Sequence, residues 1–336
     1  IKIIEIELLF EMSEVIVVGS AGIDLVTYVN NFPKSGETII GKSFEQKFGG
    51  KGANQAVILS RLGTNCIFCG MIGEDSYGDL YINQLINEGV NIKGIIKTNL
   101  ISTGVACITV ADGGANMIII NPGANYLLNK EHIENIVKLY ESASVLVCQN
   151  EIPPESTLFA LQLGRKLGML TIFNPAPISS NRELLWSSIL EADIICPNET
   201  ELYELLNHEY PVDTIEQIQL AANHLHERGV KIIIVTLGSR GAFLSNGEIK
   251  ELIPAPIVEN CIDTVGAGDC FVGTLAHHLS HGSNLYDAIT KAIQCASISV
   301  TRKGAQESYP TSAELITLGI VNNEVGNKSN IRQLHG

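Results

Sequence analysis

The chain has 336 residues, of which 45% are hydrophobic and 17% charged, so it is long enough to bury the core of one large domain with an appendage. Its formal net charge of −14 argues against nucleic acid and anionic membranes as partners, and no uncharged stretch reaches the length of a membrane span. An anionic substrate would therefore have to be held by local dipoles, a few cations and metal.

The N-terminal residues and the cysteines bear on the cellular compartment. No Met precedes Met12, so residues 1–12 are interpreted as an N-terminal extension, and the charged residues among the first ten make a secretory signal a poor fit. The eight cysteines stand in apolar contexts, as reduced thiols do. Cys66 and Cys69 form a C-x-x-C in a strand-like run, where a role in the core is expected. The cytoplasm is the expected compartment, with the nucleus as a second one in a eukaryote.

Strand-like and helix-like runs alternate along most of the chain, which predicts a doubly wound, mostly parallel sheet with helices on both faces. The predicted strands are residues 15–19, 67–73, 143–148, 170–173, 194–196 and 232–236. The predicted helices are residues 52–62, 77–88, 156–167, 199–206, 215–228 and 270–281. His277 and His278 are expected on the solvated flank of the last helix.

Two stretches break this alternation. Residues 38–48 and 103–120 alternate with a period of two, and Asp112-Gly113-Gly114 is typical of a hairpin turn. Such antiparallel strands cannot belong to the parallel core, so we expect a small separate sheet that acts as a lid, with an edge extension of the main sheet as the alternative. The predicted layout is an α/β domain over residues 13–312, a lid inserted from about 24–48 and 98–121, and a C-terminal helix and tail over 313–336.

The segment Asp263-Thr-Val-Gly-Ala-Gly-Asp269 is the most informative motif. Its glycine-rich turn opens directly into the predicted helix 270–281, and bare N–H groups at a helix N-terminus bind anions. A carboxylate beside a phosphate is electrostatically unfavourable, so its presence in this turn indicates a chemical role. Taking a proton from the attacking hydroxyl would be such a role. Asp269 is therefore interpreted either as this general base or as a plain helix cap.

Two motifs near the N-terminus suit a small polar ligand. Residues 19–24 end the first strand, and Asp24 can pair with two adjacent sugar hydroxyls or serve in a turn. Residues 48–55 read FGGKGANQ, whose glycines let a ligand lie against the backbone while Lys51 and Asn54 contact its hydroxyls. A plain turn is the alternative there, and the spacing is not that of a Walker A loop.

Two later motifs suit a nucleotide. In residues 197–201 (PNETE), Asn198 and Glu201 can close a capping box and can also serve Mg²⁺ and phosphate, the carboxylate through water. Residues 236–241 (TLGSRG) suit a ribose or phosphates against the backbone, with Arg240 as either a ligand contact or a surface charge. All these motifs stand at the carboxyl ends of strands, which predicts one shared site.

Together the motifs resemble the ribokinase branch of the PfkB carbohydrate kinases, over about residues 15–310. The likeness is carried by FGGKGANQ (48–55), STGVA (102–106), GAN (123–125), NPAP (174–177), PNETE (197–201), TLGSRG (236–241), DTVGAGD (263–269) and TRKGAQ (301–306). The resemblance implies a ribokinase-like α/β core and a β lid that also clasps a second subunit, and hence a homodimer.

The resemblance also implies an activity, which is ATP-dependent phosphorylation of D-ribose at O5 with Mg²⁺ and with K⁺ as an activator. It makes Asp269 the base and gives a backbone anion hole to Gly266, Ala267 and Gly268. The implied sugar-binding residues are Asp24, Gly50, Lys51, Asn54, Glu151 and Asp269. The implied ATP contacts are Asn198, Thr236, Leu237, Gly238, Ser239, Arg240, Gly241, Gly268 and Ile293, with Glu201 reaching Mg²⁺ through water.

A K⁺ site is implied as well, formed by Asp263, Val265, Ser299, Arg302, Gly304 and Ser308, several of them through main-chain carbonyls. The chain departs from the family pattern at two positions. Gly22 stands where bacterial relatives have Asn, so one sugar contact is lost or replaced by water, and Ile293 stands where Asn or His is common near the adenine.

Other functions remain open at this point. The nearest is a kinase for 2-deoxyribose, another sugar or a nucleoside such as adenosine. A catalytically silent sugar-binding protein on the same fold is a second. A dinucleotide-dependent dehydrogenase is disfavoured, because Gly19 and Gly22 lack the G-x-G-x-x-G spacing.

Overall fold

A mostly parallel sheet forms the centre of the computed structural model, which describes residues 14–320. Its nine strands are ordered β13-β12-β11-β10-β9-β8-β1-β4-β5, and β12 runs antiparallel to both of its neighbours. The strands are β1 (Glu14–Val18), β4 (Asn65–Gly73), β5 (Ile95–Thr98), β8 (Val145–Cys148), β9 (Leu170–Phe173), β10 (Ile194–Ile195), β11 (Ile232–Thr236), β12 (Ala242–Ser245) and β13 (Lys250–Ile253).

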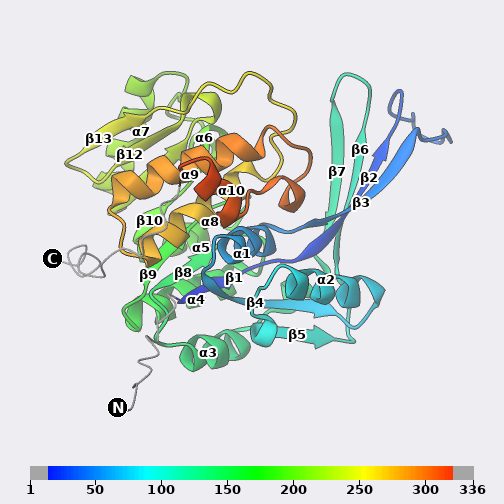
Figure 1. The fold of residues 1–336 in the computed structure, drawn as a ribbon, viewed down its shortest axis with the longest axis horizontal. Coiled ribbons are helices and arrows are strands. Elements are labelled where there is room, and N and C mark those ends of the chain that lie inside the picture. The colour runs from blue at the N-terminus through cyan, green and yellow to red at the C-terminus, as the bar shows by residue number, and fades with distance from the viewer. Residues whose placement is uncertain (1–13, 321–336) are drawn as a thin grey trace, which may run out of the picture.

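Side chains alternate between the two faces of this sheet and build two separate cores. Val15 and Val17 of β1 pack into one core, whereas Ile16 and Val18 pack into the other. One face is covered by α1 (Lys51–Arg61), α2 (Ser76–Asn87), α8 (Ala267–Ser280), α9 (Leu285–Ser299) and α10 (Ser312–Thr317). The other face is covered by α3 (Lys130–Leu139), α4 (Pro154–Lys166), α5 (Arg182–Glu191), α6 (Glu199–Leu205) and α7 (Ile215–Glu227), as Figure 1 shows.

The predicted fold class is confirmed, and each predicted strand and helix of the body is present with ends shifted by a few residues. Helices α3, α5 and α9 and strands β5, β12 and β13 are structure beyond that prediction. The predicted extension over residues 1–12 lies outside the described residues, as does the tail beyond residue 320. Within residues 14–320, no helix combines the length and the apolar character that crossing a bilayer requires.

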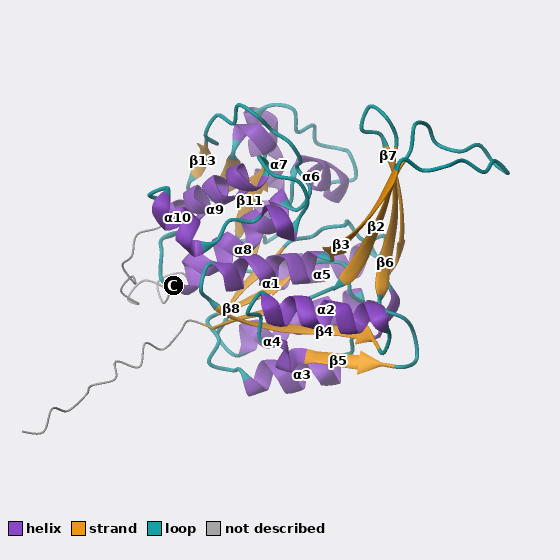
Figure 2. Cartoon of the chain, turned by 45° about the vertical axis from the view of Figure 1, so that its right-hand side comes forward, coloured by secondary structure: helices purple, strands orange, loops and turns teal. Residues whose placement is uncertain are grey.

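A second sheet of four strands, in the order β3-β2-β6-β7, stands apart from the body (Figure 2). The hairpin predicted at residues 112–114 joins β6 to β7, whereas β2 and β6 run parallel, so the sheet is mixed rather than purely antiparallel. The predicted strand over 38–48 begins only at Ser43. The small separate sheet is therefore confirmed, while the division of the chain into domains stays a prediction. Its strands are β2 (Gly22–Tyr28), β3 (Ser43–Gly49), β6 (Gly104–Val110) and β7 (Asn116–Asn121).

The lid and the body meet where β1 ends. Residues 19–21 are all that separate β1 from β2, and Gly50 alone separates β3 from α1. A Cβ on Gly52 would lie 2.7 Å from the Cα of Gly19, so the first turn of α1 packs backbone to backbone against the loop after β1. This approach puts the N-terminus of α1 at the carboxyl edge of the sheet, where open α/β sheets bind ligands.

Two predictions about side chains in the body have different outcomes. Cys66 and Cys69 are both buried on β4 but face opposite cores, so they cannot share a metal ion, and their role in the core is confirmed. The expected solvated position of His277 and His278 is wrong, because α8 is packed between α1 and α9. Burial holds the pKa of His277 well below its ordinary value and lowers the pKa of His278 to about 4, so both imidazoles are neutral.

Candidate active site

Two cavities meet at the carboxyl edge of the central sheet. The large cavity, of about 940 Å³, lies between the lid strands, the start of α1 and residues 261–266. The small cavity, of about 180 Å³, is lined by residues that follow β9 and β10, by Thr236 and by the first turn of α8. Lys51, Gly266 and Asp269 border both cavities, so a group held between them could pass from one to the other.

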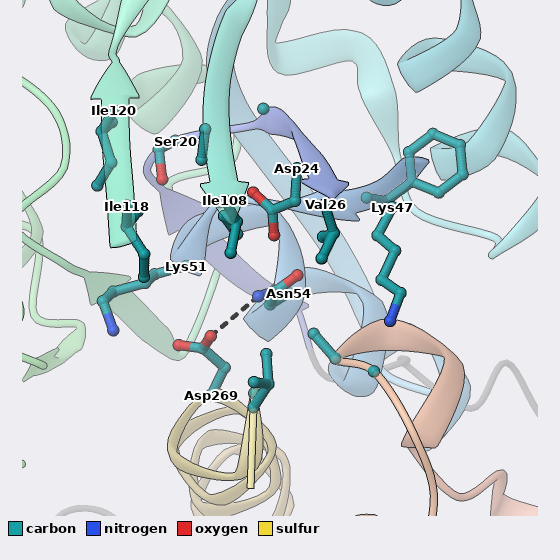
Figure 3. A pocket seen from close by; sticks show the side chains of 18 of the residues that line it. Ser20, Asp24, Val26, Lys47, Lys51, Asn54, Ile108, Ile118, Ile120 and Asp269 are labelled. Atoms are coloured by element: carbon teal, nitrogen blue, oxygen red, sulfur yellow. Dashed lines mark hydrogen bonds between the residues drawn. The ribbon is translucent and has the colours of Figure 1, made fainter. Parts of the chain in front are cut away.

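Asp269 is held in place by α1. It stands in the first turn of α8 and is 6% exposed. Its Oδ2 accepts a hydrogen bond from Asn54 Nδ2 at 3.0 Å (Figure 3), and its Oδ1 accepts one from Gln55 Nε2 at 2.9 Å. Within the described residues, its carboxylate accepts no hydrogen bond from the backbone of α8, so the interpretation as a plain helix cap is wrong.

The N-terminus of α8 presents backbone N–H groups to the cavities. Gly266 has a φ of 75°, and a Cβ there would lie 2.7 Å from Tyr309 Oη, so this turn requires glycine. The Ala267 N–H donates to the Thr264 carbonyl at 3.2 Å, and Ala267 lines neither cavity. The N–H groups of Gly266 and Gly268 have no such partner in the described part of the chain, and both residues line the small cavity. Of the predicted anion hole, Gly266 and Gly268 are therefore placed to bind an anion and Ala267 is not.

The structure brings the predicted sugar-binding residues together around the large cavity. They are Asp24, Gly50, Lys51, Asn54, Glu151 and Asp269. Asp24 comes from β2 of the lid rather than from a turn after β1, and the others come from the body. Burial raises the pKa of Asp24 to about 6, and the charges of Glu151 and Glu307 add to the effect.

Gly22 has no room for a side chain. It faces Gly104 across the parallel pairing of β2 and β6. A Cβ on Gly22 would lie 2.9 Å from the carbonyl oxygen of Gly104, which is closer than real Cβ contacts allow. The glycine is therefore built into the strand pairing, and no side chain from this position reaches the large cavity.

Glu151 and Lys51 form the charged floor of the large cavity. Ser20 Oγ donates to Glu151 Oε2 at 2.6 Å, and the backbone N–H of Lys51 donates to the same oxygen at 2.9 Å, so the carboxylate sits at the N-terminus of α1. Burial alone would lower the pKa of Lys51. The carboxylates of Asp269, Glu151 and Glu201 outweigh burial and raise it, so Lys51 remains a cation between the two cavities.

Asn198 and Glu201 line the small cavity and close a capping box at the start of α6. Asn198 Oδ1 accepts from the Glu201 N–H at 2.8 Å, and Glu201 Oε2 accepts from the Asn198 N–H at 2.9 Å. Burial raises the pKa of Glu201, against the lowering effect of this N–H bond and of Lys51. The cap engages Oε2 alone and leaves Oε1 for a metal-bound water. The free oxygen of Glu201 faces a cavity with room for water. This arrangement fits Mg²⁺, which keeps several of its waters when it binds to a protein.

The loop after β11 meets the small cavity through Thr236. Leu237 is 2% exposed and belongs to the core. Residues Gly238–Arg240 form a short 3-10 helix whose Ser239 is exposed, and Gly241 has a φ of 100° that favours glycine. Any nucleotide contact of this loop beyond Thr236 would therefore be made largely by its backbone and by Ser239.

Of the predicted nucleotide contacts, Asn198, Thr236 and Gly268 line the small cavity, and the other six, which include Arg240 and Ile293, line neither cavity. The Arg240 guanidinium pairs with the Glu199 carboxylate and donates to the Asp213 carbonyl at 2.9 Å, so it is occupied within the protein. Ile293 lies on α9, is 5% exposed and packs into the core. Its place near an adenine stays a prediction.

The residues predicted to hold K⁺ join two loops. Asp263 Oδ2 accepts from the Gly304 N–H at 2.9 Å, and Oδ1 accepts from the Val265 N–H at 3.1 Å. The remaining side chains are engaged elsewhere: the hydroxyls of Ser299 and Ser308 bond main-chain carbonyls, and Arg302 pairs with Glu314. No group of three or more His, Cys, Asp or Glu side chains between residues 14 and 320 is arranged to bind a metal ion. A cation here would rely on main-chain carbonyls, which suit a hard cation.

Several residues of the site are absent from the sequence-based prediction. Gln55 contacts Asp269, Gln306 Nε2 donates to Asn54 Oδ1 at 3.0 Å, and Asn125 bonds both the N–H and the carbonyl of Ala21 at 2.9 Å. The signal was present, because Gln55, Gln306 and Asn125 are the last residues of GGKGANQ, TRKGAQ and GAN.

Comparison with known proteins agrees with this geometry. The model of the pfkB family of carbohydrate kinases matches residues 12–312. A deoxyribokinase of Salmonella typhimurium is 39% identical over 298 residues, which are 89% of this chain and 96% of the relative, and a ribokinase of Mus musculus is 38% identical over 309 residues, 91% and 94% of the two chains.

A solved structure is similar in fold as well as in sequence. The Arabidopsis thaliana ribokinase complexed with ribose and ATP superposes with a TM-score of 0.81 at 31% identity, covering 91% of this chain and 98% of that one. These matches span nearly the whole of both partners in each comparison. The chain therefore belongs to the pfkB family of carbohydrate kinases, as a sugar kinase of the ribokinase branch.

Proposed function

We propose that this enzyme transfers the γ-phosphoryl group of ATP to O5 of D-ribose and releases ribose 5-phosphate and ADP. The observation that carries the proposal is the position of Asp269, whose carboxylate borders both the large and the small cavity. The sugar would occupy the large cavity beside Asp24, Asn54 and Glu151, and the phosphates would occupy the small cavity. The mouse ribokinase and the ribose- and ATP-bound plant ribokinase support this assignment.

In this mechanism Asp269 accepts the proton of the attacking hydroxyl. A primary alcohol is too weak an acid to ionise first, so the proton moves late, as the O5–phosphorus bond forms. The N–H groups of Gly266 and Gly268 and the ammonium of Lys51 stabilise charge on the transferring oxygens. The lid excludes water from the large cavity and so limits hydrolysis of ATP.

The ions are part of the proposal. Asn198 and Glu201 would hold Mg²⁺ through its waters, and the ion, when bound with ATP, neutralises phosphate charge. The loops joined by Asp263 would hold K⁺ through their carbonyls, next to the turn that ends at Gly266. K⁺ would act by holding that turn in shape rather than by contacting the sugar.

Phosphorylation of 2-deoxyribose is a second candidate function, favoured by Gly22. The close pairing of β2 with β6 requires a residue without a side chain at position 22. The large cavity therefore has one polar group fewer for a sugar hydroxyl than the family pattern implies. 2-Deoxyribose has one hydroxyl fewer than ribose. The similar Salmonella protein is a deoxyribokinase.

We also propose that two copies associate through their lids. Apolar side chains are exposed on β7 and β3, among them Ile119 at 74%, Ile120 at 62% and Phe44 at 61%. An apolar face of this kind is typical of an interface.

Replacing Asp269 by Asn should lower kcat by roughly 10²- to 10⁴-fold, because the proton acceptor is lost while the shape is retained. Steady-state kinetics with MgATP and sugar measure the loss, and calorimetry checks that the variant still binds sugar. Full activity in Asp269→Asn would contradict the assignment.

Turnover with a panel of ribose, 2-deoxyribose, hexoses and adenosine, each in K⁺ or in Na⁺ alone, should show pentose-dependent ADP release that is greater in K⁺. A kcat/KM for 2-deoxyribose equal to or above that for ribose would select the second candidate. Sugar binding without turnover on any substrate would indicate a silent binding protein, and equal rates in both salts would refute the K⁺ site.

Sugar capture should weaken at acidic pH. Asp24 has a raised pKa of about 6 in the free protein, and its ionised form accepts hydrogen bonds from two hydroxyls on two charged oxygens, whereas protonation turns one of these oxygens into a donor and removes the charge. Below pH 6 the protonated fraction grows, so kcat/KM for the sugar should fall, by about tenfold at pH 5. Asp24→Asn should have a low kcat/KM without this acid limb; an unchanged limb in the variant would assign it to another group.

The lid interface predicts a dimer in sedimentation experiments. Replacing Ile119 by Lys should shift the protein towards monomers, because a charge would be buried at the apolar contact. A wild-type protein that sediments as a monomer at micromolar concentration would refute the interface.

A further inference from the structure

Two neighbouring residues of α1 each donate a hydrogen bond to one oxygen of the Asp269 carboxylate. Asn54 Nδ2 donates to Oδ2 and Gln55 Nε2 donates to Oδ1. The two donors differ in one respect. Asn54 also lines the large cavity, whereas Gln55 is 0% exposed and lines neither cavity. Gln55 therefore has no route to a substrate except through Asp269.

The orientation of the Gln55 amide follows from the chemistry of its partner. An ionised carboxylate only accepts hydrogen bonds, so Gln55 must turn its NH₂ towards Asp269 and its oxygen away. That oxygen accepts from Gln149 Nε2 at 2.7 Å. Gln149 is 0% exposed and lies at the end of β8, so the orientation of the carboxylate is tied to the central sheet.

This series of hydrogen bonds leaves one buried atom of Gln149 without a partner among the described residues. With the NH₂ of Gln149 turned to Gln55, Gln149 Oε1 has no hydrogen-bond partner in the described part of the chain. A buried acceptor without a partner is unfavourable, and apolar residues at both Gln149 and Gln55 would avoid it. The stability of the fold alone does not account for the hydrogen bonds that join Gln149, Gln55 and Asp269.

We propose that Gln55 is a positioning residue for the reaction: it holds Oδ1 of Asp269, fixes the rotation of the carboxylate and keeps the other oxygen directed at the sugar hydroxyl. The inference rests on the proposed role of Asp269 as the base. Gln149 acts indirectly, because its hydrogen bond to Gln55 Oε1 fixes the orientation of the Gln55 amide.

Gln55→Met keeps the length of the side chain and removes the donor. We expect kcat to fall by roughly 10- to 100-fold, the range for a hydrogen bond to a charged group, with KM for sugar and for ATP unchanged. The matched control is Ile58→Val, one turn further along α1, where Ile58 is 0% exposed and contacts α8 at Gly273. The control should lower the melting temperature without lowering kcat.

Gln55→Glu separates positioning from packing. A protonated carboxyl group at this position can still accept from Gln149 and donate to Asp269, whereas an ionised one repels Asp269. The kcat of this variant relative to wild type should therefore rise as the pH falls from about 8.5 to 6. A merely structural defect would leave the ratio constant across pH, and that result would overturn the proposal even if Gln55→Met failed to fold.

The outcomes also distinguish this inference from the function it rests on. Full activity of Asp269→Asn would refute the base, and with it the positioning role. An inactive Asp269→Asn together with a fully active Gln55→Met would leave the base in place and refute only the role of Gln55.

Discussion

The backbone contact between the first turn of α1 and the loop after β1 is the constraint on which the site depends. Because Gly52 lies against Gly19, α1 begins at the carboxyl edge of the sheet rather than above it. Three consequences follow from that position: Lys51 lies between the two cavities, Asn54 and Gln55 reach Asp269 on α8, and the N-terminus of α1 meets Glu151. A side chain at either glycine would displace all of these groups together.

Charge in the site is arranged to handle an anion inside an acidic protein. The chain has a net charge of −14, and Asp24, Glu151, Glu201 and Asp269 all face the cavities. Lys51 and the backbone N–H groups of α8 are the groups that favour phosphate between them. With four carboxylates facing the cavities, phosphate binding would depend on the Mg²⁺ proposed to arrive with the nucleotide, and free anions should be bound poorly.

Most of the fold and the position of Asp269 at the centre of the site could be predicted from the sequence, for physical reasons. A strand buried on both faces, such as β1, must be apolar throughout, and a glycine-rich turn before a helix is specific enough to indicate Asp269. Relations set by tertiary packing were not predictable. The sequence leaves open whether Asp24 serves in a turn, and the structure places it within β2; the sequence predicts His277 on a solvated flank, although α1 and α9 cover it. The role of Arg240 stays open in the sequence and that of Gln55 is absent from it, because their partners Glu199 and Asp269 are distant in the chain.

The position of Asp24 on β2 has a consequence for how the enzyme senses its sugar. The lid carries this carboxylate, and the body carries Glu151 and Asp269, whose charges oppose the ionisation of Asp24 across the loop at residues 19–21. This like-charge repulsion acts between the lid and the body. Under the proposed function, a polyol that donates hydroxyls to both sides would replace the repulsion with a bridge, so the sugar itself would serve as the latch. An alcohol too short to span the two sides would leave the lid unlatched, even where its hydroxyl can reach Asp269.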